Sequence, residues 1–236
     1  MIRAAAVAVA ALALVPMGTA AVAAPSKAAA ARDWSRTVAV TGAGGVRMGN
    51  PAARVKLIEY ASLACPHCRH FHETGFDPLV QRYVRSGKVS YEYRNLLING
   101  PDVSMAVLAH CAPTGQFFAF ADRVYATQPQ WQKRVQDASQ SRGAELEAMT
   151  DQQRVLRYAQ LGGFAQIAAR FGVSPVRARQ CLSDPKRVER LLAVVEKASE
   201  FGINRTPTFV INGKVSGAAT WEDLEPQLKN ALGGRG

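Results

Sequence analysis

Apolar residues along this chain recur at two spacings, and the two spacings separate strands from helices. Apolar residues at every second position, as at Val89, Tyr91 and Tyr93, indicate a strand with one buried face. Continuous apolar runs of similar length, bounded by turn residues, indicate a strand buried on both faces. By these criteria we expect strands at residues 37–41, 55–60, 89–94, 208–211 and 214–216, and only a turn at residues 42–50.

Helical spacing of apolar residues predicts most of the remaining elements. The first long helix should end at Ser86, and Gly75 and Pro78 should bend or interrupt it. The central part of the chain contains no convincing strand, and the polar residues 128–140 indicate a break between helices. We expect further helices at residues 103–112, 116–127, 151–160, 164–171, 175–182, 185–201 and 220–232.

Strands on both sides of a helical block predict an α/β protein whose sheet domain carries an inserted α-helical subdomain. The sheet domain should comprise residues 37–102 as its first part and residues 185–236 as its second part. The inserted helical subdomain should span residues 103–184. Any site that draws on both ends of the chain therefore belongs to the sheet domain.

The first 24 residues have the features of a secretory signal peptide, which the mature protein would lack. Arg3 supplies the positive start, residues 4–15 are uninterruptedly apolar, and residues 21–23 are small enough for cleavage. The apolar run is too short to favour a membrane-spanning helix. We therefore expect export to the periplasm and a mature chain that begins with a flexible segment, residues 25–36.

Basic residues exceed acidic ones, with 29 Lys and Arg against 18 Asp and Glu and a net charge of +11. Such a surface could steer the protein toward acidic partners or anionic lipid. The basic residues form no concentrated run and are not interleaved with aromatic residues, so nucleic acid is not expected as a partner. The composition favours a solvated basic surface.

The main candidate for chemistry is the sequence Cys65-Pro66-His67-Cys68, which follows an apolar run and precedes a helical pattern. Two thiols three positions apart at a helix start can close a small disulfide whose first sulfur stays open to attack. Pro66 suits the first helical position because it has no N–H, and the unpaired N–H groups there stabilise a thiolate. We therefore interpret Cys65 as the nucleophile and Cys68 as the resolving thiol.

His67 can donate a hydrogen bond or carry positive charge inside this loop, which favours the Cys65 thiolate and makes the disulfide more oxidising. A metal site is the alternative, because His70 and His72 follow closely and are ligand types for zinc. Structural zinc sites usually draw a second ligand pair from distant sequence, yet every histidine except His110 lies in this segment. We therefore expect no metal, and interpret His70 and His72 as part of a polar helix face.

Two further cysteines, Cys111 and Cys181, remain once Cys65 and Cys68 are paired with each other. In an oxidising compartment these two should also be paired. They are 70 positions apart, and closing such a loop stabilises a fold by roughly 4 kcal/mol in the chain-entropy model. We expect a structural disulfide that closes the helical subdomain, with buried free thiols or a second redox couple as alternatives.

Two features outside the cysteine motif could take part in its chemistry. Glu59 interrupts the buried run 55–60, so it could either relay protons with a raised pKa or point to solvent from a half-exposed strand. Thr206-Pro207 opens the strand 208–211, and a cis bond there would expose backbone groups to a bound extended peptide. The alternative is an ordinary trans proline in a loop.

With these residues in place, the chain resembles the thioredoxin-fold thiol oxidoreductases, and specifically the DsbA family of bacterial periplasmic disulfide oxidases. The resemblance covers nearly the whole mature chain. It rests on Glu59 six residues before Cys65, on Pro66-His67 within the C-x-x-C motif, on the long helical insertion and on Thr206-Pro207 ahead of a strand and hairpin. The ordered set is specific, whereas a C-x-x-C alone would not be.

The resemblance implies a thioredoxin-like fold and a set of roles for these residues. Cys65 would exchange with substrate thiolates, Cys68 would resolve, Glu59 would assist proton transfer, and the Thr206-Pro207 bond would be cis beside the disulfide. It implies that substrates are exported proteins with free cysteines, that no cofactor is needed, and that a membrane-bound, quinone-linked reoxidase of the DsbB type restores the disulfide. We expect a monomer.

Two departures from the family pattern keep the direction of electron flow open. The well-known oxidase has valine where this chain has Thr206, and threonine there is also familiar from disulfide isomerases and reductases. Cys111 and Cys181 are additions to the minimal two-cysteine pattern. Against an isomerase stands the short segment 25–36, which cannot form a dimerisation domain. We favour an oxidase, with an isomerase or reductase as the alternative and a non-catalytic peptide-binding chaperone as a third reading.

Overall fold

The computed structural model describes residue 2 and residues 32–233 of the chain. The expected signal peptide and most of the segment 25–36 lie outside the described residues. Within the described end of that segment, Trp34–Arg36 forms a short 3-10 helix (η1) capped by the side chain of Asp33. The Trp34 N–H donates to the carbonyl of Arg85 at 3.1 Å, so these residues pack on the domain and do not form the flexible end that we expected.

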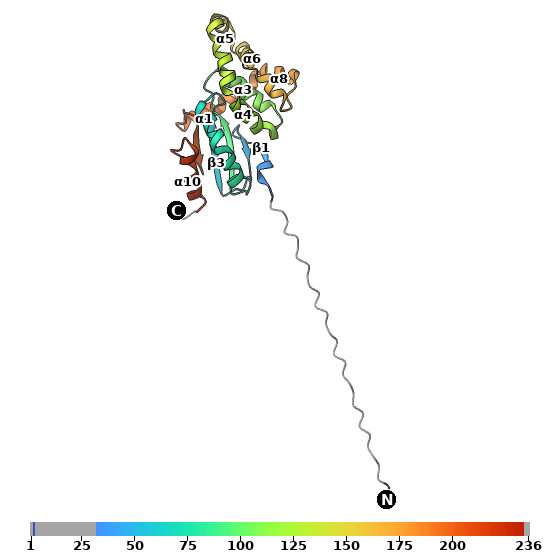
Figure 1. The fold of residues 1–236 in the computed structure, drawn as a ribbon, viewed down its shortest axis with the longest axis vertical. Coiled ribbons are helices and arrows are strands. Elements are labelled where there is room, and N and C mark those ends of the chain that lie inside the picture. Colours follow the sequence, from blue (N-terminus) through green and yellow to red (C-terminus); the bar gives the residue numbers. More distant parts are fainter. Residues whose placement is uncertain (1, 3–31, 234–236) are drawn as a thin grey trace. The chain divides into compact units, whose positions relative to one another are not determined.

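In the part of the chain that the structure describes, one sheet of six strands has the order β1-β2-β4-β3-β5-β6 (Figure 1). Strands β3 and β4 are parallel, and every other neighbouring pair is antiparallel. The strands are β1 (Val38–Val40), β2 (Val46–Met48), β3 (Val55–Ala61), β4 (Val89–Asn95), β5 (Thr208–Ile211) and β6 (Lys214–Val215). Strand β3 therefore lies inside the sheet, between β4 and β5.

Strand β2 was not predicted, because residues 42–50 were expected to form only a turn. Val46 pairs with Tyr93 of β4 and with Val40 of β1, and both Val46 and Met48 are buried. Three residues are too short to show a period of their own, so the pairing with β4 decides their conformation.

The helix after Cys65 continues from Pro66 to Val84 through two wide turns and is not interrupted. It consists of α1 (Pro66–Phe71), η2 (His72–Phe76), α2 (Asp77–Leu79) and η3 (Val80–Val84), where η2 and η3 have π-helical hydrogen bonding. Gly75 lets the helix approach its neighbours closely, because a Cβ there would lie 2.7 Å from the Cβ of Trp221 and 2.8 Å from the Phe71 ring. Where we predicted a bend or interruption, the helix is thus continuous and locally widened to π-helical turns.

The helical insertion contains a long helical stretch, kinked at Arg142, that the sequence did not predict. Its members are α3 (Gly100–Cys111), η4 (Thr114–Gln116), α4 (Phe117–Ala126), α5 (Gln128–Ala148), α6 (Asp151–Gly162), α7 (Phe164–Ala169) and α8 (Pro175–Leu182). Helix α5 occupies the polar stretch that was expected to be a break. Only Gln128, Trp131, Val135 and Leu146 of its 21 residues are buried, so most of α5 is exposed and lacks an apolar stripe.

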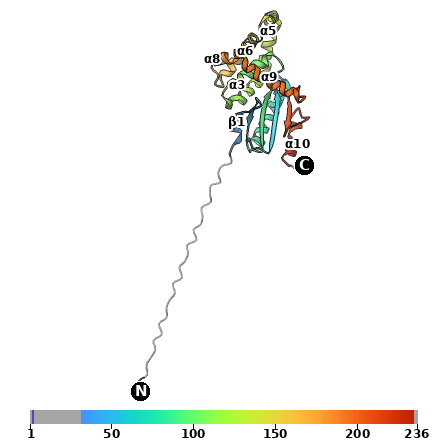
Figure 2. The same cartoon turned by 180° about the vertical axis from the view of Figure 1, so that it is seen from behind.

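Helices cover both faces of the sheet (Figures 1 and 2). Helix α1 and the C-terminal helix α10 (Trp221–Ala231) pack on one face, where Leu57, Phe71 and Phe209 join the main core. Helix α9 (Pro185–Glu200) covers the other face through a second cluster that includes Tyr60, Ala198 and Val210. Side chains alternate along β3, so Glu59 lies on the same face as α1.

A disulfide joins Cys111 at the end of α3 to Cys181 in α8, with a Cα–Cα distance of 6.2 Å. It connects two elements of the inserted helices, as expected for a link that closes this part of the chain. No helix among the described residues is both long and apolar enough to cross a membrane.

Candidate active site

The cysteine motif lies where the central strand passes into the first helix. Strand β3 ends at Ala61, a short loop follows, and Cys65 is the N-cap of α1 with an extended backbone. Pro66 occupies the first turn, where its missing N–H leaves no bond unmade. Cys65 is 5% exposed and Cys68 is 0% exposed, and both are free thiols in this structure.

The surroundings of Cys65 strongly favour its thiolate. The pKa of Cys65 is lowered to about 5, chiefly by the hydrogen bond from the Cys68 thiol, with further contributions from the Thr206 side chain and the backbone N–H groups of Cys68 and His67. Burial opposes this shift. The two N–H groups are the unpaired donors of the first helical turn, so the helix start stabilises the charge as the sequence suggested.

The Cys68 thiol has the opposite tendency. Burial raises its pKa well above the ordinary value, and the hydrogen bond to Cys65 and the charge of Glu59 act in the same direction. A thiol that keeps its proton can donate to a neighbouring thiolate, so the two sulfurs are complementary in the reduced protein.

Glu59 is buried beneath this pair and does not point to solvent. It is 1% exposed, and its carboxyl group accepts a hydrogen bond from the hydroxyl of Tyr91. Burial raises the pKa of Glu59 to about 8, with a smaller contribution from Cys65, whereas the Tyr91 bond opposes the shift. The alternative of a solvent-facing carboxyl group on a half-exposed strand is therefore wrong.

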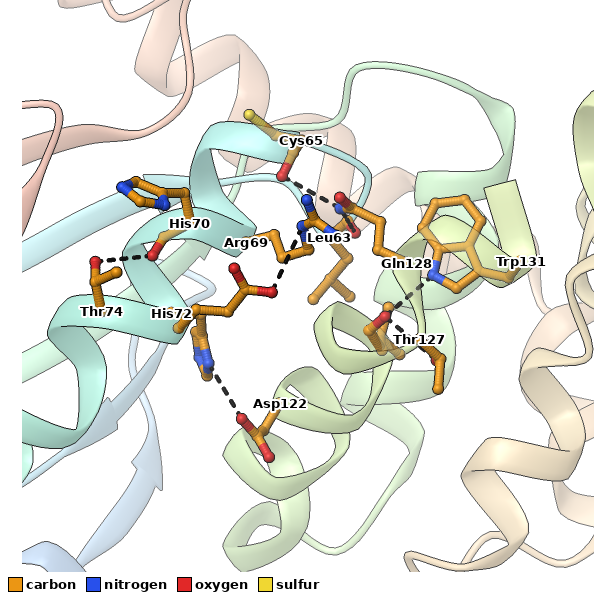
Figure 3. A network of polar contacts seen from close by, with 12 residues as sticks. Leu63, Cys65, Arg69, His70, His72, Thr74, Asp122, Thr127, Gln128 and Trp131 are labelled. Atoms are coloured by element: carbon orange, nitrogen blue, oxygen red, sulfur yellow. Dashed lines mark hydrogen bonds and ion pairs between the residues drawn. The ribbon is translucent and has the colours of Figure 1, made fainter. Parts of the chain in front are cut away.

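The histidines of the segment lie in different environments. His67 and His70 are both exposed, and for His70 this confirms the expected polar helix face. His72 is 6% exposed, stacks on Phe76 at a centroid distance of 4.2 Å, and lies 3.5 Å from the Asp122 carboxylate (Figure 3). The prediction of a polar face is therefore wrong for His72, because α4 covers that side of the helix. Among residues 32–233, no cluster of three or more His, Cys, Asp or Glu residues could hold a metal ion.

Thr206 and Pro207 reach the cysteines from the other end of the chain. The Thr206-Pro207 bond is cis, and Pro207 is buried directly before β5. The Cys65 thiol lies 3.4 Å from the carbonyl oxygen of Thr206. Pairing of β5 with β3 thus brings residues 141 positions apart together.

Sequence reasoning missed a group of polar residues of the inserted helices that bind the loop before Cys65. Asp102 and Gln128 are 0% and 1% exposed, and Gln128 donates to the carbonyls of Leu63 and Cys65 at 3.1 and 3.2 Å (Figure 3). The pattern of Asn99 followed by Asp102 indicates a helix start, yet it carries no sign that Asp102 would be buried. No sequence signal marked Gln128.

Comparison with known proteins identifies the family of this chain. The sequence matches the thioredoxin family over residues 41–230. A protein-disulfide oxidoreductase of Rickettsia bellii is 31% identical over 70% of this chain and 56% of its own length, and one of Rickettsia typhi is 32% identical over 78% and 61%. The chain therefore spans less than two thirds of the length of these relatives.

Solved structures share the fold over a larger part of their length. A protein-disulfide isomerase of Novosphingobium aromaticivorans has a TM-score of 0.74 and 28% identity, covering 79% of this chain and 96% of that one. The α-DsbA1 protein of Wolbachia pipientis has a TM-score of 0.64 and 23% identity over 79% and 90%. The predicted thioredoxin-like α/β fold with inserted helices is thus confirmed, and this fold is shared with the DsbA structure of Wolbachia. The chain belongs to the thioredoxin family.

Proposed function

We propose that this protein is a thiol:disulfide oxidoreductase that donates the Cys65–Cys68 disulfide to exported proteins as they fold. The observation that carries the proposal is the placement of the two thiols, with Cys65 at the N-cap of α1 and 3.4 Å from the Thr206 carbonyl before the cis proline, and Cys68 fully buried in the first turn. This placement lowers the pKa of Cys65 to about 5 and raises that of Cys68. Stabilising the Cys65 thiolate stabilises the reduced protein, so the disulfide readily takes up electrons. The names of the Rickettsia relatives support the same chemistry.

The reaction proceeds by two thiol–disulfide exchanges. A substrate thiolate attacks the Cys65 sulfur, the Cys65–Cys68 bond breaks, and the Cys68 sulfur leaves and takes up a proton. A second substrate thiolate then attacks the substrate sulfur of the mixed disulfide and releases the Cys65 thiolate. The substrate gains a disulfide and loses two electrons, which remain on the enzyme as a dithiol.

Glu59, Thr206 and Pro207 complete the proposed site. Glu59 lies on the face of β3 next to α1 and has a pKa near 8, so it gives a proton to the leaving Cys68 sulfur and takes it back on reoxidation. Thr206 and Pro207 border Cys65 and position an extended substrate segment beside it. His67 is exposed at the helix start, where a positive charge would further favour the thiolate.

The cellular setting forms part of this proposal. The apolar N-terminal sequence supports export to the periplasm, and the resemblance to the DsbA family supports a membrane-bound, quinone-linked reoxidase of the DsbB type as the partner. The mature protein would act as a monomer. The Cys111–Cys181 disulfide would be structural, since it lies in the inserted helices, apart from β5 and the loop that carry the redox site.

An isomerase or reductase is the second candidate, favoured by two observations. The Novosphingobium structure with a TM-score of 0.74 is named a protein-disulfide isomerase, and Thr206 precedes the cis proline. Such an enzyme would restore scrambled substrates and be held reduced in its compartment. A non-catalytic chaperone would bind substrates beside Thr206 and Pro207 without using either thiol.

The reduction potential of the Cys65–Cys68 pair tests the proposal, with Cys111–Cys181 left oxidised. An oxidase should equilibrate with glutathione at a ratio far more oxidising than that of thioredoxin. A strongly reducing potential would eliminate it. Trapping the thiols in cells separates the oxidase, which is held oxidised, from the isomerase, and Cys65→Ser abolishes both activities but spares a chaperone.

A further inference from the structure

The loop that carries Cys65 is held by side chains of the inserted helices. The Ser62 carbonyl accepts from the Tyr125 hydroxyl of α4 at 3.0 Å, and the Ala64 carbonyl accepts from Gln132 of α5 at 3.1 Å. Together with the two bonds from Gln128, these contacts satisfy every carbonyl from residue 62 to residue 65. The position of the nucleophile therefore depends on the helical insertion as well as on the sheet.

Asp102 of α3 binds the N–H side of the same loop. Its carboxyl group accepts from the Leu63 N–H at 3.0 Å and from the Ser62 hydroxyl at 2.6 Å, and the Ser62 hydroxyl accepts in turn from the Ala64 N–H at 3.0 Å. The Ile98 N–H adds a third donor at 3.2 Å. One buried carboxyl group thus fixes two successive peptide groups before Cys65.

The charge of Asp102 is stabilised by neutral donors and not by a cation. Asp102 stands in the first turn of α3, whose N-terminus favours a negative charge. Within residues 32–233, no Lys or Arg forms an ion pair with it. Burial raises its pKa to about 7, and the Cys65 charge adds to the shift. Other buried ionisable groups around the Cys65 thiol are Glu59, Cys68, Tyr91, Tyr93 and Tyr125.

We propose that Asp102 is a positioning residue for the redox site, whose carboxylate fixes the loop before Cys65 and whose negative charge moderates the oxidising power of the pair. Two anions buried close together disfavour each other. When Asp102 is ionised, the Cys65 thiolate is therefore less stable and the reduced protein is less favoured. This inference deepens the proposed function and rests on it for its biological meaning.

The first experiment measures the electrostatic coupling between Asp102 and the Cys65 thiolate in the unaltered protein. The side-chain carboxyl carbon of Asp102 is assigned by carbon NMR, and its titration midpoint is compared in the reduced and the oxidised protein. The reduced protein carries the Cys65 thiolate and should show a midpoint higher by half to one pH unit, roughly three- to tenfold in proton affinity. Equal midpoints would overturn the inference. The result does not depend on the direction of electron flow, so it separates this inference from the proposed function.

A substitution tests the consequence for redox chemistry. Asp102→Asn removes the charge, and Asp137→Asn is the matched control, because Asp137 is exposed on α5 and paired with Lys133. Above the Asp102 midpoint, Asp102→Asn should shift the glutathione equilibrium roughly three- to tenfold toward the reduced protein. Well below that midpoint it should match the unaltered protein.

A purely structural role would not produce this pH dependence. If Asp102→Asn and Asp137→Asn have the same glutathione equilibrium at every pH, the inference is wrong even when Asp102→Asn is less stable. If Asp102→Asn does not fold, the NMR comparison on the unaltered protein decides alone.

Discussion

Two thiols three positions apart hold their protons very differently in this protein, and their surroundings explain why. Cys65 stands at a helix start and accepts hydrogen bonds from the Cys68 thiol and the first-turn backbone, whereas Cys68 lies on the buried side of α1 with no solvent contact. The motif spacing predicts this division of roles. The size of the two pKa shifts also depends on groups outside the motif, among them Thr206 and Glu59.

Titration of the Cys65 thiolate in the reduced protein, followed by its ultraviolet absorbance, should give a midpoint near pH 5. Cys68→Ala should move this midpoint upward, because it removes the hydrogen bond from the Cys68 thiol, which is the largest favourable influence on the pKa of Cys65. A midpoint in Cys68→Ala at or below that of the unaltered protein would contradict the assignment. Cys65→Ser supplies the blank, since no thiolate should appear in the same range.

Glu59 should make the protein less stable as the pH rises from about 4.5 to about 8. In the native protein the buried carboxyl group keeps its proton up to about pH 8, whereas in the unfolded chain it loses the proton above its ordinary value of 4.5. The native state therefore binds more protons in this window, and the free energy of unfolding falls as pH rises through it. Asp102, with a pKa raised to about 7, acts in the same direction.

Glu59→Gln should make that decline shallower, as measured by urea unfolding across the pH range. Glu222→Gln, at an exposed position of α10, is the control and should leave the slope unchanged. The same Glu59 variant should slow reoxidation of the dithiol at neutral pH, because no buried base then accepts the Cys68 proton. An unaltered slope together with an unaltered reoxidation rate would refute the proposed role.

Among the helices and strands, α5 is the one that the spacing of apolar residues fails most clearly to predict. Its residues are mainly polar, and its few buried side chains include Gln128 and Trp131. Gln128 projects between the carbonyls of Leu63 and Cys65, so a helix that looks like a linker in sequence holds the active-site loop. Local propensity alone does not reveal such a contact, because it depends on how α5 meets the loop at residues 62–65 in the folded protein.

Gln128→Ala should lower the free energy of unfolding by about 1–3 kcal/mol, because it leaves the buried Leu63 carbonyl without a donor and removes one of the two donors of the Cys65 carbonyl. Gln130→Ala, two positions along the same helix and exposed, should cost less than about 0.5 kcal/mol. Urea unfolding of both variants checks the difference. Equal losses in the two variants would mean that the Gln128 bonds do not support the loop.

The disulfide between α3 and α8 should matter for stability and not for the redox site. Replacing both Cys111 and Cys181 by Ala should lower the free energy of unfolding by about 2–5 kcal/mol. The Cys65–Cys68 reduction potential should stay unchanged, since within residues 32–233 neither Cys111 nor Cys181 hydrogen-bonds to the active-site loop. A shifted potential would instead favour the second redox couple that the sequence left open.

At the scale of the whole molecule, the redox state of the Cys65–Cys68 pair should alter the free energy of unfolding. The Cys65 thiolate is stabilised only in the folded protein, where its pKa is about 5 against an ordinary value of 9.0. Folding therefore stabilises the reduced state, and by linkage the oxidised protein should be the less stable form.

Thermal unfolding of the two redox forms checks this directly, with the Cys111–Cys181 bond intact in both. At neutral pH the reduced form should have the higher melting temperature, and the gap should shrink as the pH falls toward 5 and the thiolate is protonated. A reducing enzyme would show the opposite order. The double variant Cys65→Ser, Cys68→Ser should be insensitive to reductant.

The sequence by itself determined the elements with a clear period and the chemistry carried by local spacing. All five expected strands, five of the central helices and the cysteine motif at a helix start are read from neighbouring residues, because pleat, helical pitch and capping act over a few positions. The Cys111–Cys181 pairing was expected by elimination among the four cysteines and the cis Thr206-Pro207 bond from the family resemblance, and both are present in the structure.

Only the tertiary structure decided which polar groups are buried, and burial is what tunes the site. Neighbouring sequence could not show that Glu59 and His72 are enclosed, that residues 46–48 pair with β4, or that α5 is a helix bound to the loop. Each of these depends on segments far apart in the chain that meet only on folding. The four residues of the motif indicate the class of reaction, whereas the buried side chains of Glu59, Asp102 and Gln128 around the thiols and their loop are evident only in the folded protein.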